Sequence, residues 1–152
     1  MRDQKTITDP VLGELVYVEV LDAWKGKLED SSIRVNVDSN PAIGSNIENI
    51  KRFVEWYSEN KENLNKKLVY ELFNYDLIHG EDFIENAFNL TEEESEKEYR
   101  ILESKVETSL KIKDISSIND NLTIGVDTGG YTGDHIIDVA LNEKYDVLTM
   151  EM

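Results

Sequence analysis

The sequence contains no cysteine, only two prolines and two histidines, and no long apolar run. Without cysteine the chain can form neither disulfides nor thiolate sites for zinc or iron–sulfur clusters. No window approaches the ~18 consecutive apolar residues of a membrane span, and the segment from Met1 to Thr6 lacks the apolar stretch of a signal peptide. We therefore expect a cytoplasmic protein that does not bind membranes.

Basic residues are also scarce. The chain has 32 acids against 16 bases, a formal net charge of −16. Residues 1–80 contain 14 acids and 10 bases, whereas residues 81–152 contain 18 acids and 6 bases. Such a field repels nucleic acid and attracts basic surfaces. The composition therefore predicts no nucleic-acid ligand and favours a basic protein partner.

Apolar residues are present in periodic groups, and a length of 152 residues fits one domain spanning residues 1–152. Alternating, β-rich runs predict an N-terminal three-stranded meander and three or four C-terminal strands, with helices between them. The expected fold class is α+β, with a mainly antiparallel sheet and the central helical segment packed on one face. The predicted strands of the meander cover residues 15–20, 23–28 and 33–37, and those of the C-terminal part cover residues 110–112, 122–126, 137–141 and 145–150.

The first predicted helix begins at Ser45, because Ser45 and Glu48 have the spacing of a capping box. Apolar residues then recur at helical spacing as far as Tyr75. A polar interruption at residues 58–63 leaves open whether this is one long helix or two nearly collinear ones. His79 and Gly80 have the properties of a helix C-terminus, so we expect the helix to end there.

Two further helical segments are expected. Residues 81–89 predict a short helix with its apolar side chains facing inward: Phe83, Ile84, Ala87 and Phe88. Thr91 and Glu94 spell a second capping box, followed by a helical apolar stripe at Tyr99, Leu102 and Val106.

The most unusual segment is the glycine-rich loop from Asp127 to His135, between two predicted strands. A phosphate-binding loop would need a helix N-terminus and nearby bases, but Lys144 is the only base after residue 114. The spacing also fails the pattern of a calcium-binding EF-hand. A metal site at Asp134, His135 and Asp138 conflicts with strand geometry, because adjacent residues of a strand point to opposite faces. We expect a hairpin loop with a structural histidine and no metal or cofactor.

Four short segments carry a resemblance: residues 9–15 (DPVLGEL), residues 24–26 (WKG), the strand at residues 33–37, and Gly133-Asp134-His135 before a strand. Together they resemble a family of small uncharacterised bacterial domains that often begin DPVFGEL and enter a late strand through a GH pair. This chain differs by Leu12 in place of phenylalanine and by Asp134 between the glycine and the histidine. Residues 123–151 also resemble the strand-rich end of Smi1/Knr4-type immunity domains, whose helix-first N-terminus is missing here. Both resemblances imply a small acidic bacterial domain, of a kind that often neutralises secreted toxins.

The leading hypothesis is a non-enzymatic binding domain, of the immunity type, for a basic toxin or another cationic protein. One alternative is a metal- or carboxylate-dependent hydrolase that uses the loop from Asp127 to His135. Another is a structural subunit of a homo-oligomer, in which the charge only provides solubility. The N-terminal meander is expected to act mainly as a scaffold. The residues predicted to contact a basic partner are Glu92, Glu93, Glu94, Glu96, Asp127, Tyr131, Asp134 and His135.

Overall fold

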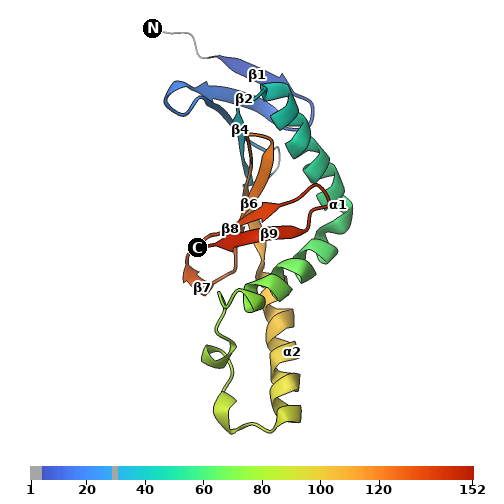
Figure 1. Ribbon diagram of the computed structural model, residues 1–152, viewed down its shortest axis with the longest axis vertical. Helices are drawn as coiled ribbons and strands as arrows, with labels where there is room; N and C mark the ends of the chain where they lie inside the picture. The colour runs from blue at the N-terminus through green and yellow to red at the C-terminus, as the bar shows by residue number, and fades with distance from the viewer. Residues whose placement is uncertain (1–4, 29–30) are drawn as a thin grey trace.

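The computed structural model describes residues 5–28 and 31–152. The chain has an α+β fold: an eight-stranded, mostly antiparallel sheet is combined with a long helix, α1 (Ile43–Asn74), and a shorter helix, α2 (Glu92–Ser109) (Figure 1). A further short strand, β7 (Tyr131–Asp134), lies outside this sheet. The strands of the sheet are β1 (Thr6–Asp9), β2 (Gly13–Val18), β3 (Ala23–Lys27), β4 (Arg34–Asp38), β5 (Lys111–Ile118), β6 (Asn121–Asp127), β8 (Ile137–Leu141) and β9 (Val147–Glu151).

The sheet follows the order of the chain, β1-β2-β3-β4-β5-β6-β8-β9. The predicted meander is confirmed as β2, β3 and β4, and the predicted C-terminal strands are β5, β6, β8 and β9. Among the described residues every pairing is antiparallel except that of β4 with β5, which is parallel. Both helices lie between these two strands in the chain and provide the long connection that a parallel pair needs. Strand β1 was not predicted, since its four residues contain only one apolar side chain, Ile7.

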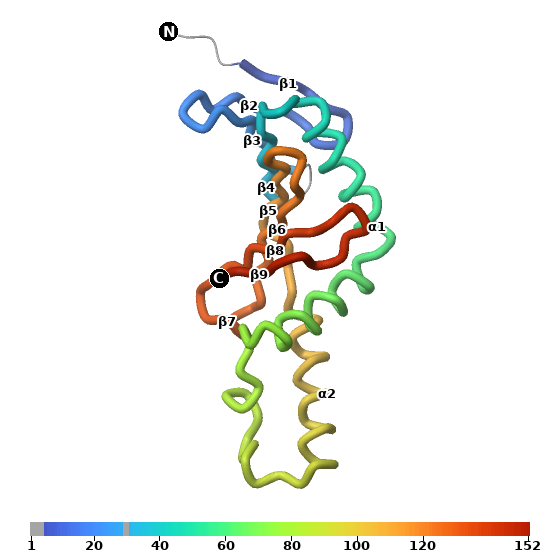
Figure 2. The backbone as a smooth tube through the Cα atoms, in the orientation of Figure 1, coloured from blue at the N-terminus to red at the C-terminus, as the bar shows by residue number. Residues whose placement is uncertain are grey.

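Apolar and polar side chains alternate along the strands, which makes one face of the sheet apolar. A row of directly paired residues crosses five strands on this face, and all of its members are buried: Val35, Ile115, Ile124, Val139 and Met150. Helix α1 runs along the same face and contacts β4, β5 and β9 (Figure 2). Its own buried side chains complete a continuous apolar core.

The start of α1 differs from the prediction. The helix begins at Ile43, and the Ser45 hydroxyl bonds Ala42 O and Asp120 Oδ1 in place of a cap. Asn46, which is 0% exposed, fixes this end. Its Nδ2 donates to the carbonyl oxygens of Asp38 and Asn40 at 2.9 and 2.8 Å. Its Oδ1 accepts from Ser117 Oγ at 2.6 Å and from the backbone amide of Asp120 at 3.0 Å.

Helix α1 is interrupted at Asn60, whose backbone is not helical, within the polar stretch where the sequence left one or two helices open. The predicted end at His79 and Gly80 is wrong. The helix ends at Asn74, and Asp76 adopts the left-handed conformation expected of a glycine, with φ of 58°. The amides of Leu77 and Ile78 then bond back to Leu72 O, which closes the helix.

Beyond α1, residues 75–109 project from the sheet as an arm formed by an irregular segment and α2 (Figure 1). The predicted helix over residues 81–89 is wrong. Two short 3-10 turns occupy Gly80–Asp82 and Ala87–Asn89. Asn86, directly before the second turn, is in the left-handed conformation. Of the four side chains expected inside, Ile84 is buried, Ala87 is partly buried, and Phe83 and Phe88 are exposed.

Helix α2 begins with the predicted capping box. The amide of Glu94 donates to Thr91 Oγ1 at 3.1 Å, and the amide of Thr91 donates to Glu94 Oε1 at 3.4 Å. Leu102 and Val106 are buried and Tyr99 packs against the core, as their spacing predicts.

Across the described ranges 5–28 and 31–152, none of the helices combines the length and the apolar character needed to cross a membrane. Residues 1–4, most of the segment on which the signal-peptide prediction rests, lie outside these ranges.

We predict that Asn46→Ala destabilises the fold by about 3 kcal/mol, because it removes the hydrogen bonds made by a fully buried side chain. Urea unfolding measures this loss. Asn49→Ala is the matched control: Asn49 donates to Ser117 Oγ and Asp120 O from a partly exposed position and should cost about 1 kcal/mol. Equal losses in the two variants would contradict a special role for Asn46.

Candidate functional site

The predicted acidic residues Glu92, Glu93, Glu94 and Glu96 all lie in the first turns of α2, and all are exposed. Carboxylates are favourable at a helix N-terminus because they face its positive end. Glu94 takes part in the capping box, and Glu96 forms an ion pair with Arg100. Glu92 and Glu93 remain as carboxylates directed to solvent at the far end of the arm (Figure 1).

The loop from Asp127 to His135 is held mainly by its own threonines. Thr128 and Thr132 are buried, and their hydroxyl groups are 2.8 Å apart. The amide of Gly129 donates to Asp127 Oδ1, and the φ of 71° at Gly129 favours glycine. A Cβ at Gly129 would also lie 2.9 Å from Ser109 Cβ, at the end of α2. These contacts give the loop a structural role.

The other predicted residues of this loop do not converge on a ligand. The Tyr131 ring packs edge-on against Phe83 of the arm, with 5.0 Å between centroids. Asp134 and His135 are both exposed. In the part of the chain that the structure describes, no three His, Cys, Asp or Glu side chains come together in a way that could hold a metal ion.

Helix α2 separates the two groups of predicted residues. Its last residue, Ser109, donates from Oγ to Thr128 O at 2.8 Å, so the loop lies against the C-terminal end of α2. The glutamates lie at its N-terminal end. Eighteen helical residues span about 27 Å. The predicted contact residues therefore form two places at opposite ends of one helix.

The element that joins them is strongly acidic. Residues 75–109, which we call the acidic arm, contain 11 acids and 3 bases, a net charge of −8. Within this arm the Phe88 side chain is 90% exposed. The prediction that Phe88 faces inward is wrong; it arose because a phenylalanine within an apparent helical stripe favours a core position. The sequence did contain a sign that the helix would be broken here, namely Asn86, two residues before Phe88. Asparagine tolerates the left-handed backbone that ends such a helix.

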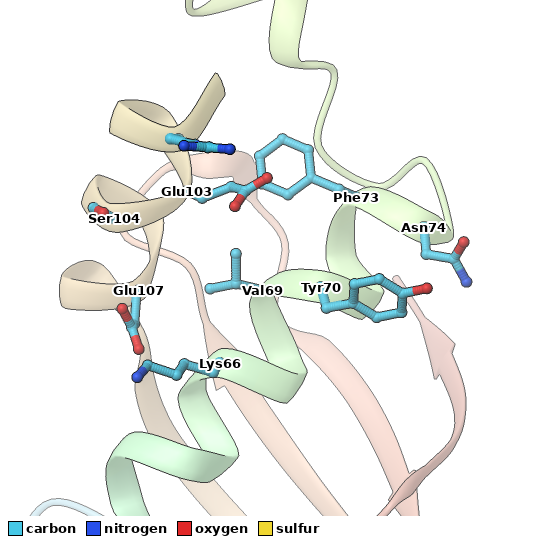
Figure 3. Close-up of a pocket in the computed structure, with 9 residues that line it drawn as sticks. Lys66, Val69, Tyr70, Phe73, Asn74, Glu103, Ser104 and Glu107 are labelled. Carbon is cyan, nitrogen blue, oxygen red and sulfur yellow. The ribbon is translucent and has the colours of Figure 1, made fainter. Parts of the chain in front are cut away.

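A groove of about 630 Å³ lies between the C-terminal half of α1 and α2. Figure 3 shows Glu103 projecting from α2 toward Phe73 of α1, whereas Glu107 points toward Lys66. Tyr70, at its edge, is 68% exposed. Within the described residues, Glu107 Oε1 is inaccessible to solvent and has no hydrogen-bond partner. Apolar and acidic groups thus line the same groove, which the sequence did not predict.

A second unpredicted feature lies on the face of the sheet opposite α1. Asp114 and Asp138 both pair with Gly125, one from each side. A Cβ at Gly125 would lie 2.5 Å from Asp114 Oδ2, so the carboxylate of Asp114 extends over the glycine. Burial, followed by the negative charge of Asp138, raises the pKa of Asp114 above its ordinary value of 3.8, although Arg34 and the Gly125 amide oppose this shift.

Comparison with family models, with curated proteins and with solved structures found no match to this chain. The resemblances of residues 9–15 and 123–151 therefore stay predictions, and the function must be argued from the geometry.

We predict that Asp114→Asn stabilises the protein near neutral pH. Because the pKa of Asp114 is raised in the folded state, the unfolded state loses its proton first as the pH rises. The wild type therefore loses stability from about pH 3.8 until the pH has passed the pKa of Asp114 in the folded state. Asparagine does not titrate and avoids this loss, and the advantage should vanish below pH 3.8. Urea unfolding of both proteins across this range measures the difference.

Asp138→Asn is the companion variant. Removing its charge should bring the pKa of Asp114 closer to the ordinary value and give a smaller gain near neutral pH, because the burial of Asp114 remains. A constant difference between Asp114→Asn and wild type at every pH would contradict the assignment.

Proposed function

We propose that this chain is a non-enzymatic binding protein whose acidic arm engages a basic surface of a partner protein. The observation that carries the proposal is the concentration of charge: residues 75–109 hold half of the net charge of the chain, −8 of −16, on an element that projects beyond the sheet (Figure 1). A projecting charged element meets a partner before the rest of the molecule does.

The arm combines the two properties that protein recognition needs. Its negative field accelerates encounter with a cationic surface, an effect that salt screens. The exposed ring of Phe88 supplies an apolar anchor, and a buried aromatic side chain mainly slows dissociation. A carboxylate surface alone would bind many cations weakly, whereas a carboxylate surface with an aromatic anchor selects a partner of matching shape.

The remainder of the molecule supports this arm. The arm continues from the end of α1 and leads directly into β5, so both of its ends are attached to the sheet and its covering helix. Gly80 packs against the Tyr99 ring so closely that a Cβ there would overlap it, which ties the irregular segment to α2. In this proposal the N-terminal meander serves as scaffold.

The specific form of the proposal is an immunity-type role, in which the arm covers the basic surface of a toxin. It is supported by the acidic arm and by the resemblance of residues 9–15 and 123–151 to small bacterial domains. The test is to mix the chain with the basic products of neighbouring genes, and to identify a co-purified partner by mass spectrometry. A partner whose toxicity is unaffected by the chain would exclude this form and leave the binding role.

We predict that Glu92→Gln, Glu93→Gln and Glu96→Gln together slow association with that partner by about fivefold at low ionic strength, because steering depends on local charge. Stopped-flow kinetics measure the rate. The matched control neutralises the exposed residues Glu14, Glu55 and Glu59, which changes the net charge equally but outside the arm. If the control slows association as much as the arm variant, only the net charge matters and the arm is not the contact.

We predict that Phe88→Ala speeds dissociation of the same complex by about tenfold, as expected for an aromatic anchor worth more than 1 kcal/mol. Stability should change by less than about 0.5 kcal/mol because the ring is 90% exposed. Val20→Ala provides the control, since Val20 is 94% exposed at the opposite part of the chain, in the meander. An unchanged dissociation rate for Phe88→Ala would remove Phe88 from the interface.

A further inference from the structure

The groove between α1 and α2 is part of a longer hollow. Toward the N-terminus of α2 it continues along Glu92, Ser95 and Tyr99, sharing Arg100 and Glu103 with the central groove. Toward β9 it continues past Glu71 and Asp146, sharing Lys66 and Tyr70. The whole hollow, which we call the α2 groove, follows α2 from Glu92 to Glu107 and then α1 as far as Val147 at the start of β9.

The floor of the α2 groove is aromatic and aliphatic. The rings of Phe73 and Tyr99 are in contact, with 6.5 Å between centroids, and Val69 continues the floor along α1. Tyr70 extends it toward β9 and is largely exposed. Val69 is buried, with 6% exposure, and Phe73 and Tyr99 are partly buried, so Tyr70 is the most open part of this floor. A partly open apolar strip between two helices matches helix-in-groove recognition, in which an amphipathic helix inserts its apolar face.

Charge decides what kind of helix fits. The lining of the α2 groove contains six acids and three bases. All three bases are already held in ion pairs with neighbouring acids: Lys66 with Glu62, Lys67 with Asp146, and Arg100 with Glu96.

The acids that line the groove differ in whether they form ion pairs. Among the described residues, Glu103 and Glu107 form no ion pair, and one carboxylate oxygen of Glu107 has no hydrogen-bond partner. Glu103 is exposed, and a rotation of the half-buried Glu107 side chain would present its carboxylate to the groove. An incoming guanidinium group would then provide charged donors to both carboxylates, in the planar geometry that carboxylates accept best. A second copy of this chain, with its net charge of −16, would instead bring like charge to an acidic groove.

We infer that the α2 groove binds a basic amphipathic helix of the partner protein. Its apolar stripe lies on Tyr70, Phe73 and Tyr99, and its arginine side chains reach Glu103 and Glu107 of α2. This inference rests on the proposed function, because it assigns the partner's contact segment to one surface of the acidic arm and the adjoining half of α1.

The test uses a fluorescently labelled synthetic peptide of about 15 residues, long enough to span most of the groove at ~1.5 Å per residue. Leucines at helical spacing form its apolar stripe and arginines flank that stripe. A shuffled peptide of the same composition, without the stripe, is the control ligand. Fluorescence anisotropy at several salt concentrations should show at least tenfold tighter binding of the amphipathic peptide.

Two variants with equal charge changes then locate the site. Glu103→Gln with Glu107→Gln should weaken binding of the amphipathic peptide by about fivefold, the scale of two partly exposed ion pairs. Glu93→Gln with Glu98→Gln, on the same helix but outside the groove lining, should weaken it less than twofold. Tyr70→Ala should speed dissociation while leaving urea unfolding unchanged.

The outcomes separate the two proposals. If the shuffled peptide binds as tightly, or both charge variants weaken binding equally, the groove is not the site, while the acidic arm still attracts cations and the proposed function stands. If neither peptide binds the wild type at low salt, the groove and the cation-binding arm are both overturned.

Discussion

The side chain of Asn46 joins the parts of this structure that are distant in sequence. Its amide bonds the loop that leads from β4 into α1, and its carbonyl oxygen accepts from β5 and from the β5–β6 turn. Strands β4 and β5 are the one parallel pair in the described part of the sheet, with 72 residues between Asp38 and Lys111. A parallel pair at such separation has no turn to set its register. Asn46 helps to fix this register and orients the start of α1 over the apolar face.

From this fixed start α1 crosses the sheet and carries the chain out to the arm. The apolar face binds the helix, and the non-helical backbone at Asn60 redirects its second half. Tyr145, between β8 and β9, packs against α1: the centroid of its ring lies 4.6 Å from that of Trp56. Its backbone is left-handed, with φ of 63°. A bulky residue in that conformation carries strain, which its packing against α1 must offset. The position of the arm thus depends on contacts made far from it.

The sequence predicted features that depend on local pattern. Alternation located the strands, and the capping box at Thr91 located α2, because those signals require only neighbouring residues. Ser45 and Glu48 spelled an equally good box, but a tertiary partner, Asp120, takes the Ser45 hydroxyl. The same limit applies to the candidate site. The charge excess was visible along residues 81–107, whereas the α2 groove and the pairing of Asp114 and Asp138 across Gly125 depend on segments that only folding brings together.

The acidic arm is one uninterrupted piece of chain. Gly80 packs against Tyr99 within it, and its buried side chains Ile78, Ile84 and Leu102 join the common apolar core of the molecule. The arm contacts the rest of the molecule through α1, where Phe73 meets Tyr99, and through the segment between β6 and β8, where Phe83 meets Tyr131 and Ser109 meets Thr128. Residues on its outer surface can therefore change without disturbing the long-range strand pairing on which folding depends. The sheet and α1 thus hold the long-range contacts of the fold, whereas the outer surface of the arm is bound by few of them and has room to vary in sequence.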